Sequence, residues 1–81
     1  MKLVLVGIDP ATNGINCPAV FLDAETGDLL LQGSTVNDSQ TLAEVARHSP
    51  IADHESVVRL PARMKAIIQE AIDDGSGTTV H

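Results

Sequence analysis

The feature that most restricts the fold is a pair of short apolar runs separated by a polar loop. Residues 19–22 and 29–32 flank the loop 23–28, which contains Gly27. Two apolar runs joined by a short loop with a glycine are typical of a β-hairpin. Gly27 can adopt the positive φ that closes a type I turn followed by a bulge. The sequence therefore predicts two adjacent antiparallel strands.

Two further segments have the composition of strands. The aliphatic run at residues 3–8 predicts a strand buried on both faces. Pro10 and the pair Asn13-Gly14 predict a turn after it. Residues 56–60 are β-branched in the middle and predict a fourth strand, and we expect the strand at 29–32 to continue to Val36.

A short helix is predicted in the middle of the chain. Residues 37–39 offer side chains that cap helices, and Thr41 and Glu44 have the spacing of a capping box. The apolar residues Leu42, Val45 and Ala46 then recur on one helical face. We expect the helix to end near residues 48–50, because the residue before a proline avoids the helical region.

The C-terminal region predicts a longer amphipathic helix. Pro61 suits the first helical position, where its missing N–H is not needed. Gly75 suits the cap at the end, and residues 75–81 have the composition of a flexible tail. An apolar stripe at helical spacing predicts the face that packs on the sheet: Met64, Ile67, Ile68, Ala71 and Ile72.

These elements together predict an α+β fold. The order is strand, strand, strand, helix, strand, helix, and we expect a small antiparallel sheet of about four strands. The C-terminal helix would cover one face of that sheet. We expect a single domain at residues 1–74, followed by the tail.

Composition restricts the class of protein further. The chain has 81 residues, a formal charge of −6 and one aromatic residue, Phe21. A phosphate backbone would be repelled by this charge, so we expect no direct binding of nucleic acid. Cys17 is the single cysteine, which favours a reducing cytoplasm over a secreted, disulfide-bonded domain, and the aliphatic run at 3–8 is too short to span a membrane. A small aliphatic core would also benefit from self-association, so a homodimer is one possible state.

Asp9 is the first candidate functional residue. An acidic residue at the end of a first strand, followed by a hairpin, resembles the start of ribonuclease-H-like nucleases, including RuvC-type resolvases. In those enzymes such a carboxylate holds a divalent metal that activates water. The family needs further carboxylates on a longer chain, and the acidic charge here opposes nucleic acid. A turn-initiating Asp before Pro10 is the simpler interpretation, and the metal-dependent nuclease remains an alternative.

Other polar residues offer alternatives. His48, Asp53 and His54 are ligand types for zinc or nickel, which leaves a metal-binding or small-molecule-binding protein as a further hypothesis. Their spacing matches no compact metal motif, so we expect solvated polar residues of a loop. Cys17 precedes Pro18 and an apolar strand, which favours a buried small residue over a nucleophile. We predict no catalytic residue and no cofactor.

A family resemblance comes from two stretches of the chain. Residues 13–20 read Asn-Gly-Ile-Asn-Cys-Pro-Ala-Val and lead into the hairpin, and residues 57–63 read Val-Val-Arg-Leu-Pro-Ala-Arg. The chain resembles small actinobacterial proteins of the BldB type, which accompany helix-turn-helix regulators of the WhiJ type, over residues 13–36 and 57–72. It differs at Met64, where that family carries Trp, and in residues 39–55, so the resemblance is a distant one.

The resemblance implies a non-enzymatic accessory protein in transcription regulation. Such a protein would self-associate and bind a DNA-binding regulator, as one component of an antitoxin- or toxin-like pair. No catalytic residue is carried over. The acidic charge agrees with a basic partner, because complementary potentials raise the rate of association.

Overall fold

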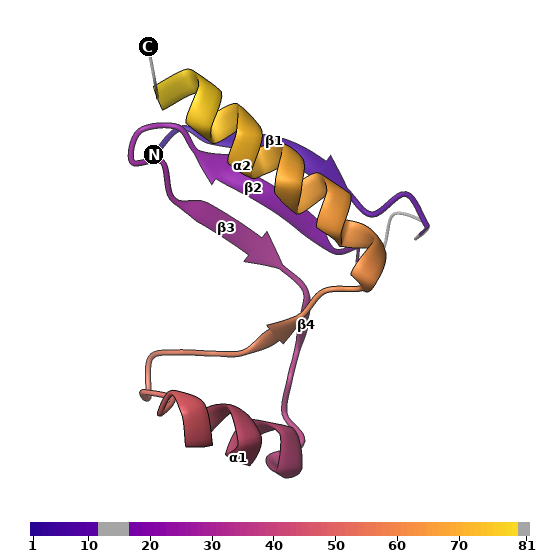
Figure 1. The fold of residues 1–81 in the computed structure, drawn as a ribbon, viewed down its shortest axis with the longest axis vertical. Coiled ribbons are helices and arrows are strands. Elements are labelled where there is room, and N and C mark those ends of the chain that lie inside the picture. Colours follow the sequence, from indigo (N-terminus) through magenta and orange to yellow (C-terminus); the bar gives the residue numbers. More distant parts are fainter. Residues whose placement is uncertain (12–16, 80–81) are drawn as a thin grey trace.

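The computed structural model describes residues 1–11 and 17–79, and side chains up to residue 73. The predicted α+β fold is confirmed (Figure 1). In chain order the elements are β1 (Leu3–Ile8), β2 (Ala19–Asp23), β3 (Leu29–Gln32), β4 (Ser34–Thr35), α1 (Ser39–His48), β5 (Val58–Arg59), the 3-10 turn η1 (Ala62–Met64) and α2 (Lys65–Thr79). The turn predicted at Asn13-Gly14 lies outside the described residues.

The predicted hairpin is confirmed as β2 and β3. Both strands belong to an antiparallel sheet in the order β1-β2-β3, so β2 is central. Gly27 has φ of 84°, and its N–H donates to the carbonyl of Asp23 at 2.8 Å. The turn thus requires a backbone conformation that glycine adopts without a steric cost.

The prediction that β3 continues to Val36 is wrong. The strand ends at Gln32, and residues 34–35 form β4, which pairs antiparallel with β5 in a separate two-stranded sheet. The break lies at Gly33, where a Cβ would lie 2.6 Å from the carbonyl oxygen of Arg59, so a glycine is needed there. Because residues 34–35 pair with β5, the expected four-stranded sheet is divided into three strands and two.

Residues 34–59 form an arm that carries α1 away from the three-stranded sheet (Figure 1). Helix α1 begins after Asp38, whose carboxylate accepts a hydrogen bond from the Thr41 N–H at 2.8 Å. The predicted capping box of Thr41 with Glu44 is therefore wrong, because Asp38 takes the capping position and Glu44 lies within the helix. The end of the helix at His48 agrees with the prediction from Pro50.

Helix α2 packs on β1 and β2 and forms the core of the molecule with them. Val20 of β2 and Met64 of η1 have no exposed surface, and Ala71 of α2 completes their cluster. Ile67 and Ile68 pack against this cluster as partly buried residues. These contacts confirm the predicted covering of one sheet face by the C-terminal helix.

Three details of this region differ from the predictions. Pro61 has ψ of 152° and precedes the 3-10 turn, so it lies outside the helix instead of at its first position. Ile72 is 49% exposed and is not among the residues that pack against the core cluster, although its neighbour Ala71 belongs to it. We expect helix α2 to end at Gly75, but it continues to Thr79. Residues 75–79, which we expect to be a flexible tail, are therefore helical. Residues 80–81 lie outside the described part of the chain, so the tail stays a prediction there.

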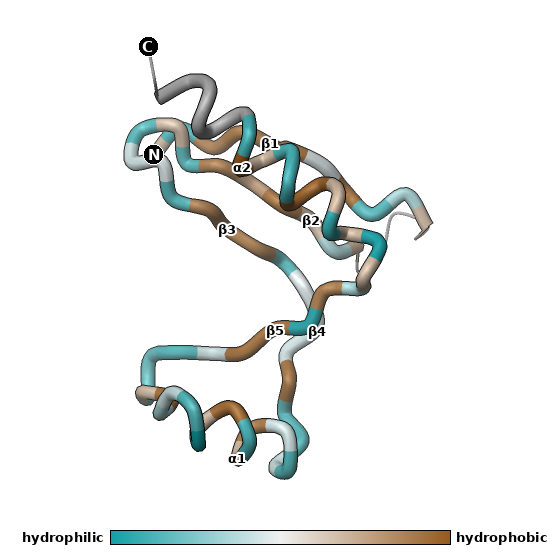
Figure 2. Tube along the Cα trace, in the orientation of Figure 1, coloured by the Kyte–Doolittle hydropathy of each residue, from teal (hydrophilic) through white to brown (hydrophobic). Residues whose placement is uncertain are grey.

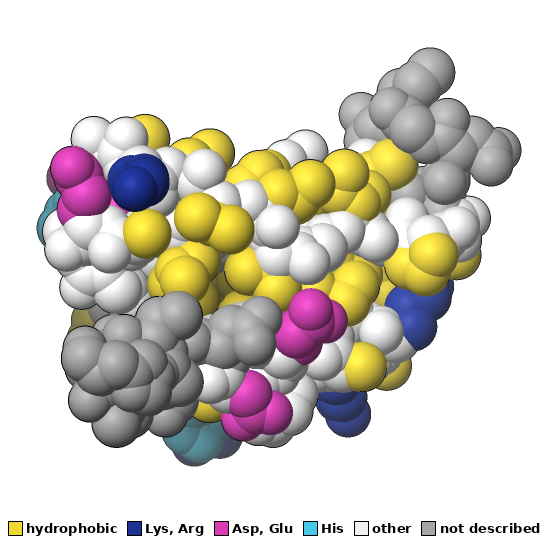
Figure 3. All heavy atoms as spheres, turned by 90° about the horizontal axis from the view of Figure 1, so that it is seen from above, with side chains coloured by type: hydrophobic (Ala, Val, Ile, Leu, Met, Phe, Trp, Pro, Cys, Tyr) yellow, Lys and Arg dark blue, Asp and Glu magenta, His cyan; other side chains and the backbone are white. Residues whose placement is uncertain are grey.

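Apolar side chains remain exposed on both outer strands of the sheet. Leu3, Val4, Leu5 and Ile8 of β1 are each 44–49% exposed, and three consecutive leucines of β3 are exposed as well. Figure 2 shows these strands as apolar stretches. Figure 3 views the molecule from above Figure 1 and shows rows of hydrophobic side chains on that side. Exposed apolar surface of this kind is typical of a protein that associates.

Candidate functional site

Asp9 lies directly after β1 and is the buried acidic residue of the described chain, with 1% of its surface exposed. The Arg63 Nε donates to its Oδ1 at 2.7 Å, and the Arg63 Nη2 donates to its Oδ2. The backbone N–H of Ala11 donates to Oδ1 at 3.0 Å. The bond to Ala11 is the turn-initiating contact expected of an Asp before a proline. The two-point contact with Arg63 joins the end of β1 to the start of the C-terminal helical segment.

The electrostatics of this pair favour the charged forms of both side chains. The hydrogen bond from Arg63 holds the pKa of the Asp9 carboxyl below its ordinary value, against the opposing effect of burial. The same hydrogen bond raises the pKa of the Arg63 guanidinium. A paired guanidinium and carboxylate in a fork geometry form one of the stronger polar contacts in proteins. Asp9 is therefore an ionised carboxylate whose charge is compensated by Arg63.

This arrangement bears on the nuclease hypothesis. A divalent metal at Asp9 would compete with Arg63 for both carboxylate oxygens. Within the described side chains, no three residues among His, Cys, Asp and Glu are grouped so that they could hold a metal ion. The geometry of Asp9 is that of a structural ion pair, and it gives the nuclease hypothesis no support.

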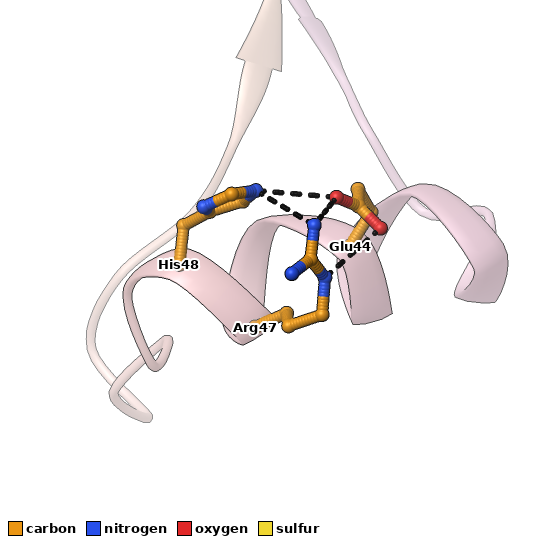
Figure 4. A network of polar contacts seen from close by, with 3 residues as sticks. All are labelled: Glu44, Arg47 and His48. Atoms are coloured by element: carbon orange, nitrogen blue, oxygen red, sulfur yellow. Dashed lines mark hydrogen bonds and ion pairs between the residues drawn. The ribbon is translucent and has the colours of Figure 1, made fainter.

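His48 contacts Glu44 and Arg47 on α1, and not Asp53 and His54, the other two predicted metal ligands. Its Nε2 lies 3.2 Å from the Glu44 carboxylate and 3.1 Å from the Arg47 Nη2 (Figure 4). Arg47 also donates to Glu44, and this contact lowers the pKa of the Glu44 carboxyl. All three side chains are exposed on α1. Asp53 and His54 are exposed in the connection that follows, so the structure does not bring the three predicted ligands into one group.

Cys17 is partly buried, which differs from the full burial we expected. It precedes β2, whose first residues Ala19 and Val20 supply the buried surface instead. The residues 12–16 that precede Cys17 lie outside the described part of the chain.

The arm contains a pocket of about 360 Å³ between the end of α1 and the segment that leads to β5. Its lining combines aliphatic side chains with two serines and Glu55, whose carboxylate accepts a hydrogen bond from the Ala52 N–H at 2.9 Å. A pocket with aliphatic side chains and a carboxylate can hold a long basic side chain, with the stem on apolar atoms and the charged end at the carboxylate. The lining residues are Val45, Ser49, Pro50, Ile51, Glu55, Ser56 and Val57.

Sequence reasoning identified Asp9 and missed its partner. Arg63 lies 54 positions later, and no local pattern links the two residues. The arm pocket was missed for a similar reason, because it forms where the two ends of the connection 49–57 come together beside Val45 of α1. A carboxylate after an apolar strand and an arginine at the start of a helix were the available signals.

Within the described residues, neither helix has the length and the hydropathy that crossing a bilayer requires. Comparison of the chain with models of protein families, with curated proteins and with solved structures gives no significant match.

Proposed function

We propose that this chain is a non-enzymatic accessory protein of the cytoplasm that acts by binding a basic helix-turn-helix regulator of transcription. The observation that carries the proposal is the arm, which stands out from the sheet (Figure 1) and offers a pocket lined by aliphatic side chains, two serines and Glu55. The resemblance to proteins that accompany such regulators supports the class of partner.

The charge of the chain supports a basic partner. The formal charge is −6, and Asp53 and Glu55 are exposed on the arm itself, where Arg47 compensates the charge of Glu44. Acidic groups around an apolar contact accelerate encounter with a basic surface, and salt screens this attraction. The expected contact therefore combines an arginine or lysine inserted into the arm pocket with charge attraction around it.

The test is a binding titration with a purified helix-turn-helix regulator from the same organism, by isothermal calorimetry at low and high salt. Glu55→Lys reverses the charge at the pocket, and Val57→Asp places a charge among its aliphatic residues. Glu70→Lys is the matched control, because it makes the same charge change at an exposed position of α2, outside the arm.

We expect binding that weakens with salt, that falls at least tenfold in Glu55→Lys and Val57→Asp, and that changes little in Glu70→Lys. Melting curves of each variant confirm that the fold is retained. An absence of binding at micromolar concentrations contradicts the proposed partner. Equal losses in Glu55→Lys and Glu70→Lys contradict the arm as the contact and leave only a general effect of charge.

A further inference from the structure

Strand β1 lies at an edge of the three-stranded sheet, and β2 is its neighbour there. The Lys2 carbonyl accepts from the Ala24 N–H, which places the backbone groups of Lys2 on the side of β2. Backbone groups of successive residues point to opposite sides of an antiparallel strand. The N–H and C=O groups of Leu3 and Leu5 therefore point away from β2, toward the open edge.

The sequence of β1 is unusual for an edge. It reads Leu-Val-Leu-Val-Gly-Ile, without a charge or a proline. Natural edge strands usually carry such residues, because they prevent pairing with other chains. A continuous aliphatic run is instead typical of a strand buried on both faces, whereas Leu3, Val4 and Leu5 are 44–49% exposed. The register shift between Leu5 and Gly7 leaves the segment 3–5 regularly paired with β2, so its outer edge is free of the bulge.

The surface of the molecule exceeds what a chain of this mass usually exposes. The accessible area is 5930 Å², whereas a monomer of 8.5 kDa exposes about 4,700 Å². The radius of gyration is 14.3 Å, against about 12 Å for a compact domain of this length. The surplus area is larger than the roughly 800 Å² that one partner contributes to a standard interface. The chain therefore exposes more surface than a compact monomer of its mass, and the arm that stands out from the sheet contributes to this surplus.

Charge decides which occupant fits β1 best. Two copies of a chain with charge −6 repel each other wherever their acidic surfaces meet. Leu3–Ile8 contains no charged residue, so pairing β1 with β1 of a second copy places no like charges opposite each other in the two strands. A basic partner would instead be drawn to the acidic surfaces, such as the arm.

We propose that the outer edge of β1 pairs antiparallel with β1 of a second copy, around a two-fold axis at Val4. Leu3 of each copy then lies opposite Leu5 of the other, and their outward backbone groups exchange hydrogen bonds. The contact is isologous and closes after two copies. It joins two three-stranded sheets into one of six strands. This inference does not depend on the proposed regulator.

The experiment measures molar mass by light scattering over a range of concentrations, with Leu5→Lys as the variant and Leu30→Lys as its matched control. Leu5 and Leu30 both pair with Phe21, on the same sheet face, and both are exposed. Leu5 is at the proposed edge, and Leu30 is at the opposite edge. Leu3→Lys is a second variant at the proposed contact. Amide exchange of the unmodified chain, at low and high concentration, tests the same contact without a substitution.

We expect the unmodified chain and Leu30→Lys to show twice the mass of one chain, and Leu5→Lys and Leu3→Lys to show the mass of one folded chain. We also expect the amides of Leu3 and Leu5 to gain protection as concentration rises.

A single-chain mass for the unmodified protein overturns the proposal. The proposal is also overturned if both β1 variants remain dimeric, or if Leu30→Lys abolishes the dimer as well. Open-ended growth beyond two copies likewise overturns it, since it indicates pairing of β1 with β3. Should both β1 variants unfold, unchanged exchange at Leu3 and Leu5 overturns the proposal and concentration-dependent protection supports it.

Discussion

Arg63 holds the buried carboxylate of Asp9 with two hydrogen bonds, across 54 positions of the chain. Asp9 follows β1, and Arg63 lies in the 3-10 turn that leads into α2. The pair thus connects the end of the first strand to the turn from which α2 begins to cover the sheet. Its carboxylate is almost inaccessible to solvent, whereas the Arg63 side chain is half exposed.

Removal of Arg63 should destabilise the fold. Arg63→Met leaves an ionised carboxylate in a buried site without its guanidinium, which is a costly state. We expect a clear fall in the free energy of unfolding, measured by denaturant titration, and a smaller fall for Arg63→Lys, which keeps the charge and loses the fork geometry. Arg47→Met is the control, because it breaks an exposed ion pair with Glu44 and should change little. An Arg63 variant as stable as Arg47→Met would show that the pair is of no structural importance.

The stability of the fold should depend on Asp9 at low pH. The hydrogen bond from Arg63 lowers the Asp9 pKa in the folded state, so the unfolded state binds its proton first as the pH falls. The contribution of Asp9 is therefore complete above the ordinary Asp pKa of about 3.9 and is lost as the pH falls through the folded value.

Asp38 and Glu44 also have lowered pKa values and contribute to the total dependence on acid. The comparison with Asp9→Asn isolates one residue. The difference in unfolding free energy between the unmodified chain and Asp9→Asn should shrink on acidification, and a difference constant from neutral pH to pH about 2 would contradict the assignment.

Gly7 is predicted to be required for the packing of α2 on β1. A Cβ at Gly7 would lie 2.9 Å from Cγ2 of Ile67, an atom fixed close to the helix backbone. Gly7→Ala should therefore cost about 1–3 kcal/mol through overpacking. Ile67→Ala removes the opposing atom, so the double variant should lose less stability than the sum of the two single variants. Additive losses in thermal melts would place the cost in the backbone of β1 instead of this contact.

Met64 and Ile72 should differ in their contribution to stability, although both belong to the apolar stripe. Met64 has no exposed surface, and Met64→Ala should cost about 2–5 kcal/mol because it leaves a cavity. Ile72 is half exposed, and Ile72→Ala should change stability by about 0.5 kcal/mol or less. Denaturant titration of both variants checks this order, and a large loss from Ile72→Ala would show that the side chain is covered in solution.

Local sequence signals were sufficient where one short segment decides its own structure. The glycine of the turn at Gly27, the apolar runs on either side of it and the spacing of Met64, Ile67 and Ala71 predicted the hairpin and the packed face of α2. The signals failed where a distant segment intervened. Gly33 has the appearance of a residue within a strand, and only the approach of Arg59 shows why the chain leaves the sheet there.

The sequence by itself determined the fold class, the hairpin, the two helices and the acidic charge, because these follow from short-range periodicity and composition. Only the tertiary structure decided that Asp9 is paired with Arg63, that β1 lies at an edge and that an arm carries α1 away from the sheet. Each of these depends on which segments far apart in the chain meet in space. Such long-range contacts are determined by the packing of the whole molecule, and the periodicity of one segment does not predict them.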